Sequence, residues 1–398
     1  MRAPLVALTL FLASPALAER SALSAEIAAQ GLAAAEARLA SLAEPTANDL
    51  FALAGLQFLG GVEDALQIRW RTGVQSDWSE LPILRLPIPE NPAAQPFASS
   101  DFIALLTGLQ TRMDDARKAL TRLGSQDVAL EIALGDLWFD INDNGARNDG
   151  EGVTDVAGLT LGGAARFAMQ PVNDPVIRFD TADAAWLSAY TEFLSAFATL
   201  AQAYDPAPAI DRIMTSSAAM KAMWGDMPPN NAFDMMFGRQ VDRAAMVLTA
   251  LSQTPDAAMT QKAHAHLLAM ITENRRFWTL VEAETDNDSE WVPNDRQVSG
   301  MGLTMPPGTG ARWQAVLADG EKLLKGELLI PHWRYGAGAG INIARLFQDP
   351  APIDLITWIQ GEGLLRYAEK GPVASPFAWN EFASLVQGDE LLFAVFLN

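Results

Sequence analysis

Residues 182–204, ADAAWLSAYTEFLSAFATLAQAY, contain the clearest structural signal in the chain. Their largest side chains recur at alternating spacings of four and three residues, which places them on one face of an α-helix. These side chains are Trp186, Tyr190, Phe193, Phe197, Leu200 and Tyr204. The segment therefore predicts a long amphipathic helix, and a fold that is built mainly from helices.

Helical patterns continue on both sides of this segment. Proline interrupts a helix, so Pro45 and Pro255 mark expected helix ends. We expect further helices at residues 21–42, 46–71, 101–123, 232–251, 257–284 and 314–324, and shorter ones at 353–359 and 377–386. The fold class predicted from these patterns is mainly α, a multi-helix globular body.

One stretch departs from the helical pattern. Residues 128–134 alternate between large apolar side chains and smaller or charged ones, which is the period of a β-strand. We also expect residues 153–161 to be extended, so that a small β excursion interrupts the helical body. The expected divisions are a leader at 1–18, an N-terminal helical region at 19–127, the β excursion at 128–164 and a C-terminal helical region at 165–398, with 19–398 forming one compact unit.

The first eighteen residues have the three parts of a secretory signal peptide. Arg2 is positively charged, residues 5–13 form a short apolar run, and Ala16-Leu17-Ala18 matches a small-x-small cleavage site. The apolar run is shorter than the roughly 20 residues that span a bilayer. We therefore expect cleavage after Ala18, and a periplasmic or extracellular protein that does not span the membrane.

The charge balance narrows the range of partners. The chain has 48 Asp and Glu against 28 Lys and Arg, which gives a formal net charge of −20. Nucleic acids and anionic lipids are bound by positively charged faces, so this balance argues against both and favours cations. Acidic residues also increase solubility without binding anything. Because the chain has no Cys, disulfides and thiolate metal sites are excluded.

The segment DINDNGARNDGE, residues 140–151, fills every position of a twelve-residue Ca²⁺ loop. The expected ligands are Asp140, Asn142, Asn144, Ala146, Asn148 and Glu151. Ala146 contributes its backbone carbonyl and Glu151 both carboxylate oxygens, while Gly145 takes the position of the sharp turn. A surface turn without metal is the alternative, since Asn, Asp and Gly are also the common turn residues.

In these residues the loop resembles the Ca²⁺ loops of EF-hand and dockerin proteins. It departs from EF-hands at Arg147, where they have an apolar residue, and we expect no helices on its flanks. Residues 135–161, with Trp138 before the loop, are similar to the opening of the Ca²⁺-binding B-type repeats of bacterial surface adhesins. This local resemblance implies a structural Ca²⁺ site. It implies nothing about adhesion, because the sequence after Ala164 returns to a helical pattern.

A second acidic segment offers a weaker candidate cation site. Asp286, Asp288 and Glu290 fall on alternate positions, but the turn glycine and the closing Glu of a Ca²⁺ loop are absent. The arginines near enough in sequence to neutralise them instead are Arg275, Arg276 and Arg296. The same segment is open to two other interpretations, a solvated loop and a catalytic carboxylate pair for sugar hydrolysis with Trp291 against the sugar.

Methionine and histidine give the remaining metal hypotheses. Seven methionines lie between Met214 and Met246, and thioethers bind Cu(I). Methionine is also common core filler, and we expect these residues to pack in the core among Phe233, Phe237 and Val247. On a helix His264 and His266 point in opposite directions and cannot share one metal ion.

The sequence therefore predicts an exported, Ca²⁺-stabilised helical protein without assigned catalytic residues. We expect a non-enzymatic binding or structural protein of the cell envelope, whose partner is another protein or a small ligand. Two alternatives stay open. One is an envelope carbohydrate hydrolase that uses carboxylates in residues 286–295, and the other is Cu(I) handling through the Met214–Met246 cluster.

Overall fold

The computed structural model describes residues 20–74, 84–161, 175–224, 232–287, 289–302 and 305–375, with Phe377, Asn380 and Ser384. Several expectations fall outside this part of the chain. They are the leader at 1–18, the end of the β excursion at 162–164, Met227, Asp288 and most of the helix expected at 377–386.

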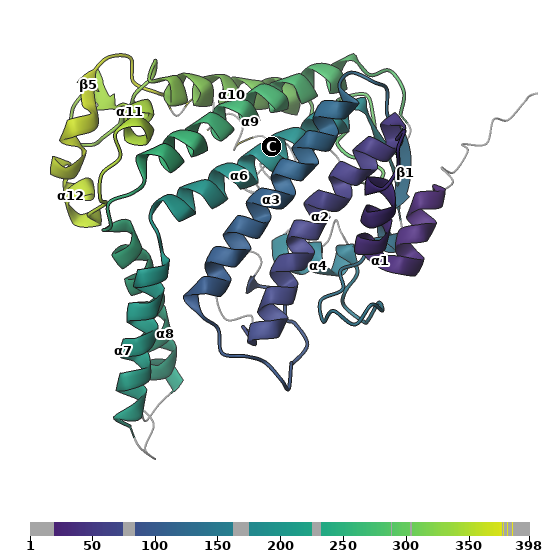
Figure 1. The fold of residues 1–398 in the computed structure, drawn as a ribbon. Helices are drawn as coiled ribbons and strands as arrows, with labels where there is room; N and C mark the ends of the chain where they lie inside the picture. The colour runs from purple at the N-terminus through teal and green to yellow at the C-terminus, as the bar shows by residue number, and fades with distance from the viewer. Residues whose placement is uncertain are drawn as a thin grey trace, which may run out of the picture.

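The described chain is mainly helical with small antiparallel sheets, as predicted (Figure 1). The helices are α1 (Ala22–Ala40), α2 (Ala47–Thr72), α3 (Ser99–Leu123), α4 (Val153–Leu161), α6 (Thr181–Ala203), α7 (Ala207–Ala222), α8 (Ala232–Leu251), α9 (Ala257–Ala283), α10 (Thr309–Lys325), α11 (Ile343–Gln348) and α12 (Leu355–Gln360), with 3₁₀ turns η2 (Leu134–Asp136) and η3 (Glu362–Tyr367). The strands are β1 (Ala129–Ala133), β2 (Val176–Asp180), β3 (Ile330–Pro331), β4 (Ala339–Ile341) and β5 (Ala368–Lys370).

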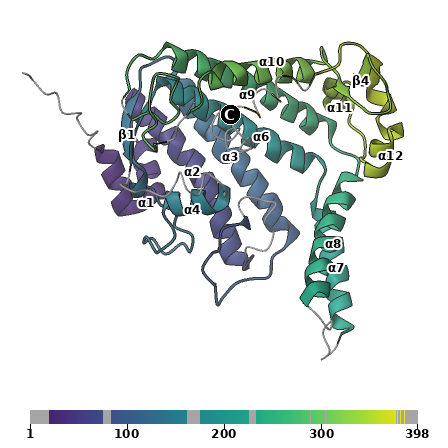
Figure 2. The same cartoon turned by 180° about the vertical axis from the view of Figure 1, so that it is seen from behind.

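The central layer is formed by α2, α3, α6 and α9, which lie side by side (Figures 1 and 2). The buried face of α6 is made of small side chains, including Ala185, Ala189 and Ala196, which let neighbouring helices approach closely. The aromatic stripe predicted for this helix is only partly inside, because Phe193 is 44% exposed and Phe197 is 55% exposed. The helix was therefore predicted correctly, but its packing face was not.

The strand predicted at 128–134 is confirmed as β1. It pairs antiparallel with β2, in a register that sets Ala129 opposite Asp180 and Ala133 opposite Val176. The prediction of extended structure at 153–161 was wrong, since these residues form α4. The apolar positions Val153, Val156 and Leu159 are three residues apart, a spacing that fits a helix, and all three pack on the main core.

The segment between β1 and α4 belongs to the same core as the N-terminal helices. Buried Ile132, Phe139 and Ile141 join a cluster with Leu53 of α2 and Ile177 of β2. Among the described helices, none is both long and apolar enough to cross a bilayer.

Candidate functional site

The loop at 140–151 begins after β1 and η2 and ends one residue before α4. Its two ends are held together, because Phe139 N donates to Glu151 O at 2.8 Å and Trp138 forms an antiparallel bridge with Gly152. A helix therefore follows the loop, which corrects the expectation that neither flank is helical. An EF-hand has helices on both sides of its loop. Here only the exit side is helical.

The first half of the loop turns around the Asp140 side chain. Its carboxylate accepts hydrogen bonds from Asn144 N at 3.0 Å and from Gly145 N at 2.7 Å. Gly145 has a φ of 72°, in the left-handed region that side chains other than glycine rarely adopt. This is the sharp turn that the sixth position of a Ca²⁺ loop requires.

The second half brings the other oxygen-bearing residues towards one another. Asn148 Nδ2 donates to Ala146 O at 2.8 Å and to Glu151 Oε2 at 3.2 Å, and it lies 3.5 Å from Asn144 Oδ1. A continuous set of hydrogen bonds thus joins five of the six predicted ligand residues, Asp140, Asn144, Ala146, Asn148 and Glu151.

The sixth residue, Asn142, has its Oδ1 buried with no hydrogen-bond partner within the described part of the chain. A buried acceptor left without a donor costs about 1–3 kcal/mol. A cation bound by the loop would remove this cost, because amide oxygens are ordinary Ca²⁺ ligands. The donor set contains oxygens alone, the chemistry that a hard cation prefers.

Glu151 is the most deeply buried member of the loop, at 1% exposure. Its carboxylate accepts from Ile141 N at 3.1 Å and from Asn148 N at 2.6 Å. These bonds fix the carboxylate within the loop before any ion binds. Two further acidic side chains, Asp143 and Asp149, lie exposed on the loop surface.

The loop is anchored to the N-terminal helices. Glu63 of α2 accepts from Asp140 N at 2.8 Å, and Gln67 donates to Asp140 O at 2.9 Å. Burial raises the pKa of Glu63 to about 7. Trp138 donates to Ile27 O at 2.9 Å, and its ring lies against Gly31 where α1 is kinked, so closely that a Cβ at Gly31 would sit 3.0 Å from it.

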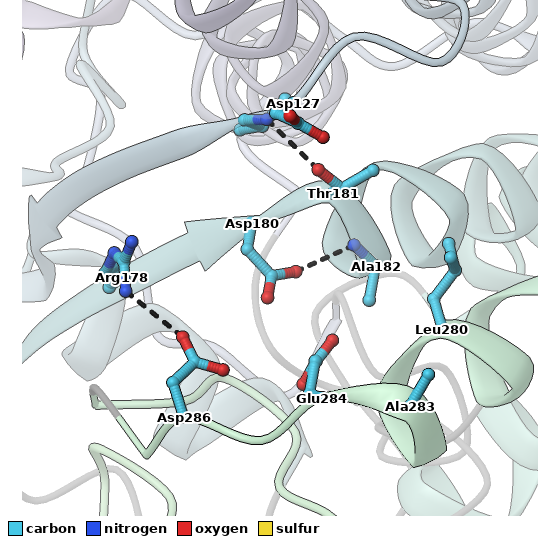
Figure 3. A pocket seen from close by; sticks show the side chains of 10 residues that line it. Asp127, Arg178, Asp180, Thr181, Ala182, Leu280, Ala283, Glu284 and Asp286 are labelled. Atoms are coloured by element: carbon cyan, nitrogen blue, oxygen red, sulfur yellow. Dashed lines mark hydrogen bonds and ion pairs between the residues drawn. The ribbon is translucent and has the colours of Figure 1, made fainter.

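A second acidic group lies at a pocket of about 340 Å³ between β2, α6 and the end of α9, which Asp180 and Glu284 line (Figure 3). Asp180 points from the end of β2 towards Glu284, and carboxylate oxygens of Asp180, Glu284 and Glu290 lie within 4.8 Å of one another. We call these three residues the acidic trio. Asp180 also accepts from Ala182 N at 2.7 Å and so caps α6.

Burial and mutual repulsion favour protonation in this group. Burial, followed by the charge of Asp180, raises the pKa of Glu284 to about 8. Asp183, one turn into α6, is fully buried, and its pKa is raised well above the usual range by burial and by Asp180. At least one of these carboxyls therefore carries a proton at neutral pH.

Two residues of the second predicted cation site have different partners in the structure, and Asp288 lies outside the described residues. Asp286 Oδ2 lies 3.3 Å from Arg178 Nη1, while Glu290 belongs to the acidic trio. The three neighbouring arginines have other partners: Arg275 pairs with Glu321, Arg276 with Glu273, and Arg296 donates to the backbone oxygens of Glu282 and Glu284. Sequence reasoning missed Asp180, although the capping pattern Asp180-x-x-Asp183 marks the start of α6.

The remaining aromatic and histidine candidates contact neighbouring elements of the fold. The ring of Trp291 packs 5.8 Å from the rings of both Phe179 and Trp186, which places it in an aromatic cluster. His264 and His266 contact different helices, as predicted. His264 Nε2 lies 2.7 Å from Leu324 O, whereas His266 contacts Glu192 of α6.

The methionines do not pack as expected. Met220, Met223 and Met236 are 50%, 85% and 51% exposed. The prediction that the cluster fills a core was therefore wrong for these side chains. The reason is that α7 and α8 pair with each other along their length, while α7 also contacts α3 of the body.

Comparison of the chain with protein-family models, with curated proteins and with solved structures gave no match.

Proposed function

We propose that residues 140–151 bind one Ca²⁺ ion, which stabilises the N-terminal half of the fold. The observation that carries this proposal is the gathering of the predicted ligand residues around a turn at Gly145, with Asn142 Oδ1 buried and unpaired. The loop has only two charged ligands, Asp140 and Glu151. Few charges mean modest affinity, which suits the range of roughly 10⁻⁴ to 10⁻³ M found for extracellular Ca²⁺ modules.

The stabilising effect follows from the anchors of the loop. Asp140 is bonded through its backbone to Glu63 and Gln67 on α2, and the residue after Glu151 leads into α4. An ion held by Asp140 and Glu151 therefore links α2 to α4. At a concentration ten times the dissociation constant, the ion adds about 1.4 kcal/mol to the free energy of unfolding.

The wider role that fits such a site is that of an exported, non-enzymatic protein. We propose that the ion is structural and that the protein binds another protein or a small ligand in the cell envelope. The acidic composition and the signal-like N-terminus support this proposal.

The test is a set of melting curves with Ca²⁺ and with chelator. We expect Ca²⁺ to raise the melting temperature of the wild type by a few degrees and to leave Asp140→Asn/Glu151→Gln unchanged. The matched control is Asp143→Asn/Asp149→Asn, which removes the same charge from the same loop at positions that are not ligands. This control keeps most of the shift. An equal loss of the Ca²⁺-dependent shift in both variants would show that the loop attracts the ion only through its overall charge, and would contradict the proposal.

A second candidate function is hydrolysis at the acidic trio, and it is favoured by one observation. Glu284, with a pKa of about 8, keeps a proton at neutral pH beside Asp180, and a raised carboxyl pKa is typical of a general acid. The pocket of about 340 Å³ gives access to it. Turnover of a panel of chromogenic glycosides that is lost in both Glu284→Gln and Asp180→Asn would support this candidate, and no turnover by the wild type would reject it.

A further inference from the structure

Helix α12 presents an apolar surface at one end of the molecule, opposite the end where α1 lies (Figures 1 and 2). None of its six residues is buried. Ile356 and Ile359, one turn apart on the helix, are 79% and 67% exposed, and Leu355 beside them is 41% exposed. Trp358 faces the other way and packs on the small core beneath the helix. The outer face of α12 is thus held from within and open to solvent.

Trp333, which follows β3, extends this apolar surface. Its indole Nε1 donates to Ile359 O at 3.0 Å, so the ring is fixed at the end of α12 although the residue is 75% exposed. Because the ring is already fixed, binding through it costs little side-chain entropy. We call Trp333, Leu355, Ile356 and Ile359 the α12 patch.

The backbone carbonyls at the end of α12 are bonded by side chains. The last hydrogen bond of the helix runs from Gly361 N to Thr357 O, and the carbonyls beyond it have no partner within the helix. Four consecutive side chains donate to these four carbonyls. The pairs are His332 Nε2 with Trp358 O at 3.3 Å, Trp333 Nε1 with Ile359 O at 3.0 Å, Arg334 Nη1 with Gln360 O at 3.3 Å, and Tyr335 Oη with Gly361 O.

This pairing indicates what covers the patch. In water an exposed helix end needs no side-chain donors, because water bonds to its carbonyls. Where water is removed, a carbonyl without a donor is costly, and most of all in lipid. A protein partner could supply donors of its own, whereas acyl chains supply none. The end of α12 therefore already meets the requirement that a lipid layer imposes on the backbone.

Charge and composition around the patch also fit a lipid surface. Residues 355–361 carry no charge, and residues 326–375 have five acidic and four basic residues, a net charge of −1 against −20 for the whole chain. Anionic lipid would repel the rest of so acidic a protein, so this nearly neutral end suits a zwitterionic bilayer. Trp and Tyr are enriched where acyl chains meet headgroups. The Arg334 guanidinium, 5.1 Å from the centre of the Trp333 ring, can stay at headgroup level while its stem lies on apolar surface.

We infer that the α12 patch inserts into the interface of a zwitterionic lipid bilayer and holds the protein at a membrane surface. The apolar side chains of the patch enter the boundary between headgroups and acyl chains, and the four donor side chains stay bonded to the end of α12. Binding of this kind needs no spanning helix, and it is weak and reversible because four side chains bury a small apolar area. It does not depend on an ion in the loop at 140–151, so either proposal can fail without the other.

Flotation of the purified protein with phosphatidylcholine vesicles, at up to about 5 mM lipid, tests the inference. We expect the wild type to float with the vesicles at low and at high salt, because the contact is apolar. In Ile356→Glu the partition into vesicles should fall about tenfold or more, since a charged side chain replaces an inserted one. Val241→Glu is the matched control, because Val241 is 48% exposed on α8 and its replacement adds the same charge outside the patch. This control should float like the wild type, and circular dichroism melts establish that each variant is folded.

Phosphatidylcholine with brominated acyl chains gives a second readout, because bromine quenches tryptophans that reach the chains. We expect quenching in the wild type and its loss in Trp333→Phe, although the chain has 11 tryptophans. A wild type that does not float with vesicles would overturn the inference. So would an equal loss of flotation in Ile356→Glu and Val241→Glu, or quenching that is unchanged in Trp333→Phe.

Discussion

Replacing Glu284 by Gln should remove a pH-dependent loss of stability. The Glu284 carboxyl lies at the C-terminal end of α9, faces Asp180 and Glu290, and accepts a hydrogen bond from Gln297 Nε2 at 3.1 Å. Buried Asp183 adds a further acidic group on the α6 side. The cations nearby are engaged elsewhere, Arg178 with Asp286 and Glu131, and Arg296 with backbone oxygens including that of Glu284.

The sign and size of the effect follow from the pKa. In the folded chain the pKa of Glu284 is about 8, against 4.5 for the unfolded reference. Between these values the folded state holds a proton that the unfolded state releases, so stability falls as pH rises through this window. The 3.5 pH units between 4.5 and 8, at 1.36 kcal/mol each, give an upper limit of about 5 kcal/mol. Since the side chain is half-buried, solvent screening reduces this to about 1–2 kcal/mol.

Urea unfolding of wild type and Glu284→Gln at several pH values from 5 to 8.5 measures the effect. As the pH rises from 5 to 8.5, the free energy of unfolding of Glu284→Gln should increase by about 1–2 kcal/mol relative to that of the wild type, because the amide does not ionise. Gln126→Glu, an exposed change in the loop before β1, is a control that produces no such trend. The measurements are made in chelator and repeated with millimolar Ca²⁺.

If the free energies of unfolding of wild type and Glu284→Gln differ by the same amount at every pH, this reasoning is refuted. Such a result would mean that Glu284 titrates near its ordinary pKa and that the trio is well solvated. If the trend is present in chelator and disappears in Ca²⁺, a cation neutralises the acidic trio, and the trio is a second cation site.

The remaining predictions concern the loop, the methionines and the N-terminus. Gly145→Ala should lower the free energy of unfolding by about 1–2 kcal/mol, since φ is 72° there and no atom lies near enough to clash. In contrast, Gly108→Ala replaces a glycine in open helical backbone and should raise the free energy of unfolding by about 0.5–1 kcal/mol. Urea unfolding measures both changes. Titration with Cu(I) against a competing chelator should show no tight site that depends on Met220 and Met223. The intact mass of protein recovered from periplasm or medium should correspond to a chain that begins at Glu19, and retention of residues 1–18 would contradict this.

Local patterns in the sequence predicted the elements of the fold well. Alternation predicted β1, and the four-and-three spacing predicted α6, because both periods are properties of one segment. The packing of α6 was not predictable in the same way. The contact face is decided by what surrounds the helix, and small residues such as Ala189 can pack more closely against a neighbouring helix than Phe197 can.

The errors at α4 and α7 have separate physical causes. Val153, Val156 and Leu159 were interpreted as extended, although their spacing of three fits a helix too.

 

Helix α7 was not among the expected helices. Pro206 is its N-cap residue and Pro208 lies in its first turn, where the missing N–H costs nothing. The exposed methionines were placed in a core because composition alone does not separate a buried helix from an apolar surface.

The candidate site was predictable to different degrees. The loop at 140–151 is contiguous, so its ligand set and the turn at Gly145 could be identified from spacing. The acidic trio joins Asp180 to Glu284 and Glu290, which are about a hundred residues away in sequence. No local pattern connects them. The packing of α6 against α9 brings Asp180, at the start of α6, beside Glu284, at the end of α9.

The central claim is that the loop at 140–151 binds Ca²⁺ through Asp140 and Glu151. Isothermal titration calorimetry of the metal-free chain with Ca²⁺ tests it most directly, with Glu151→Gln measured in parallel. We predict binding to this loop with a dissociation constant of roughly 10⁻⁴ to 10⁻³ M, and its loss in Glu151→Gln. No binding heat at millimolar Ca²⁺, or the same binding in Glu151→Gln, would contradict the claim.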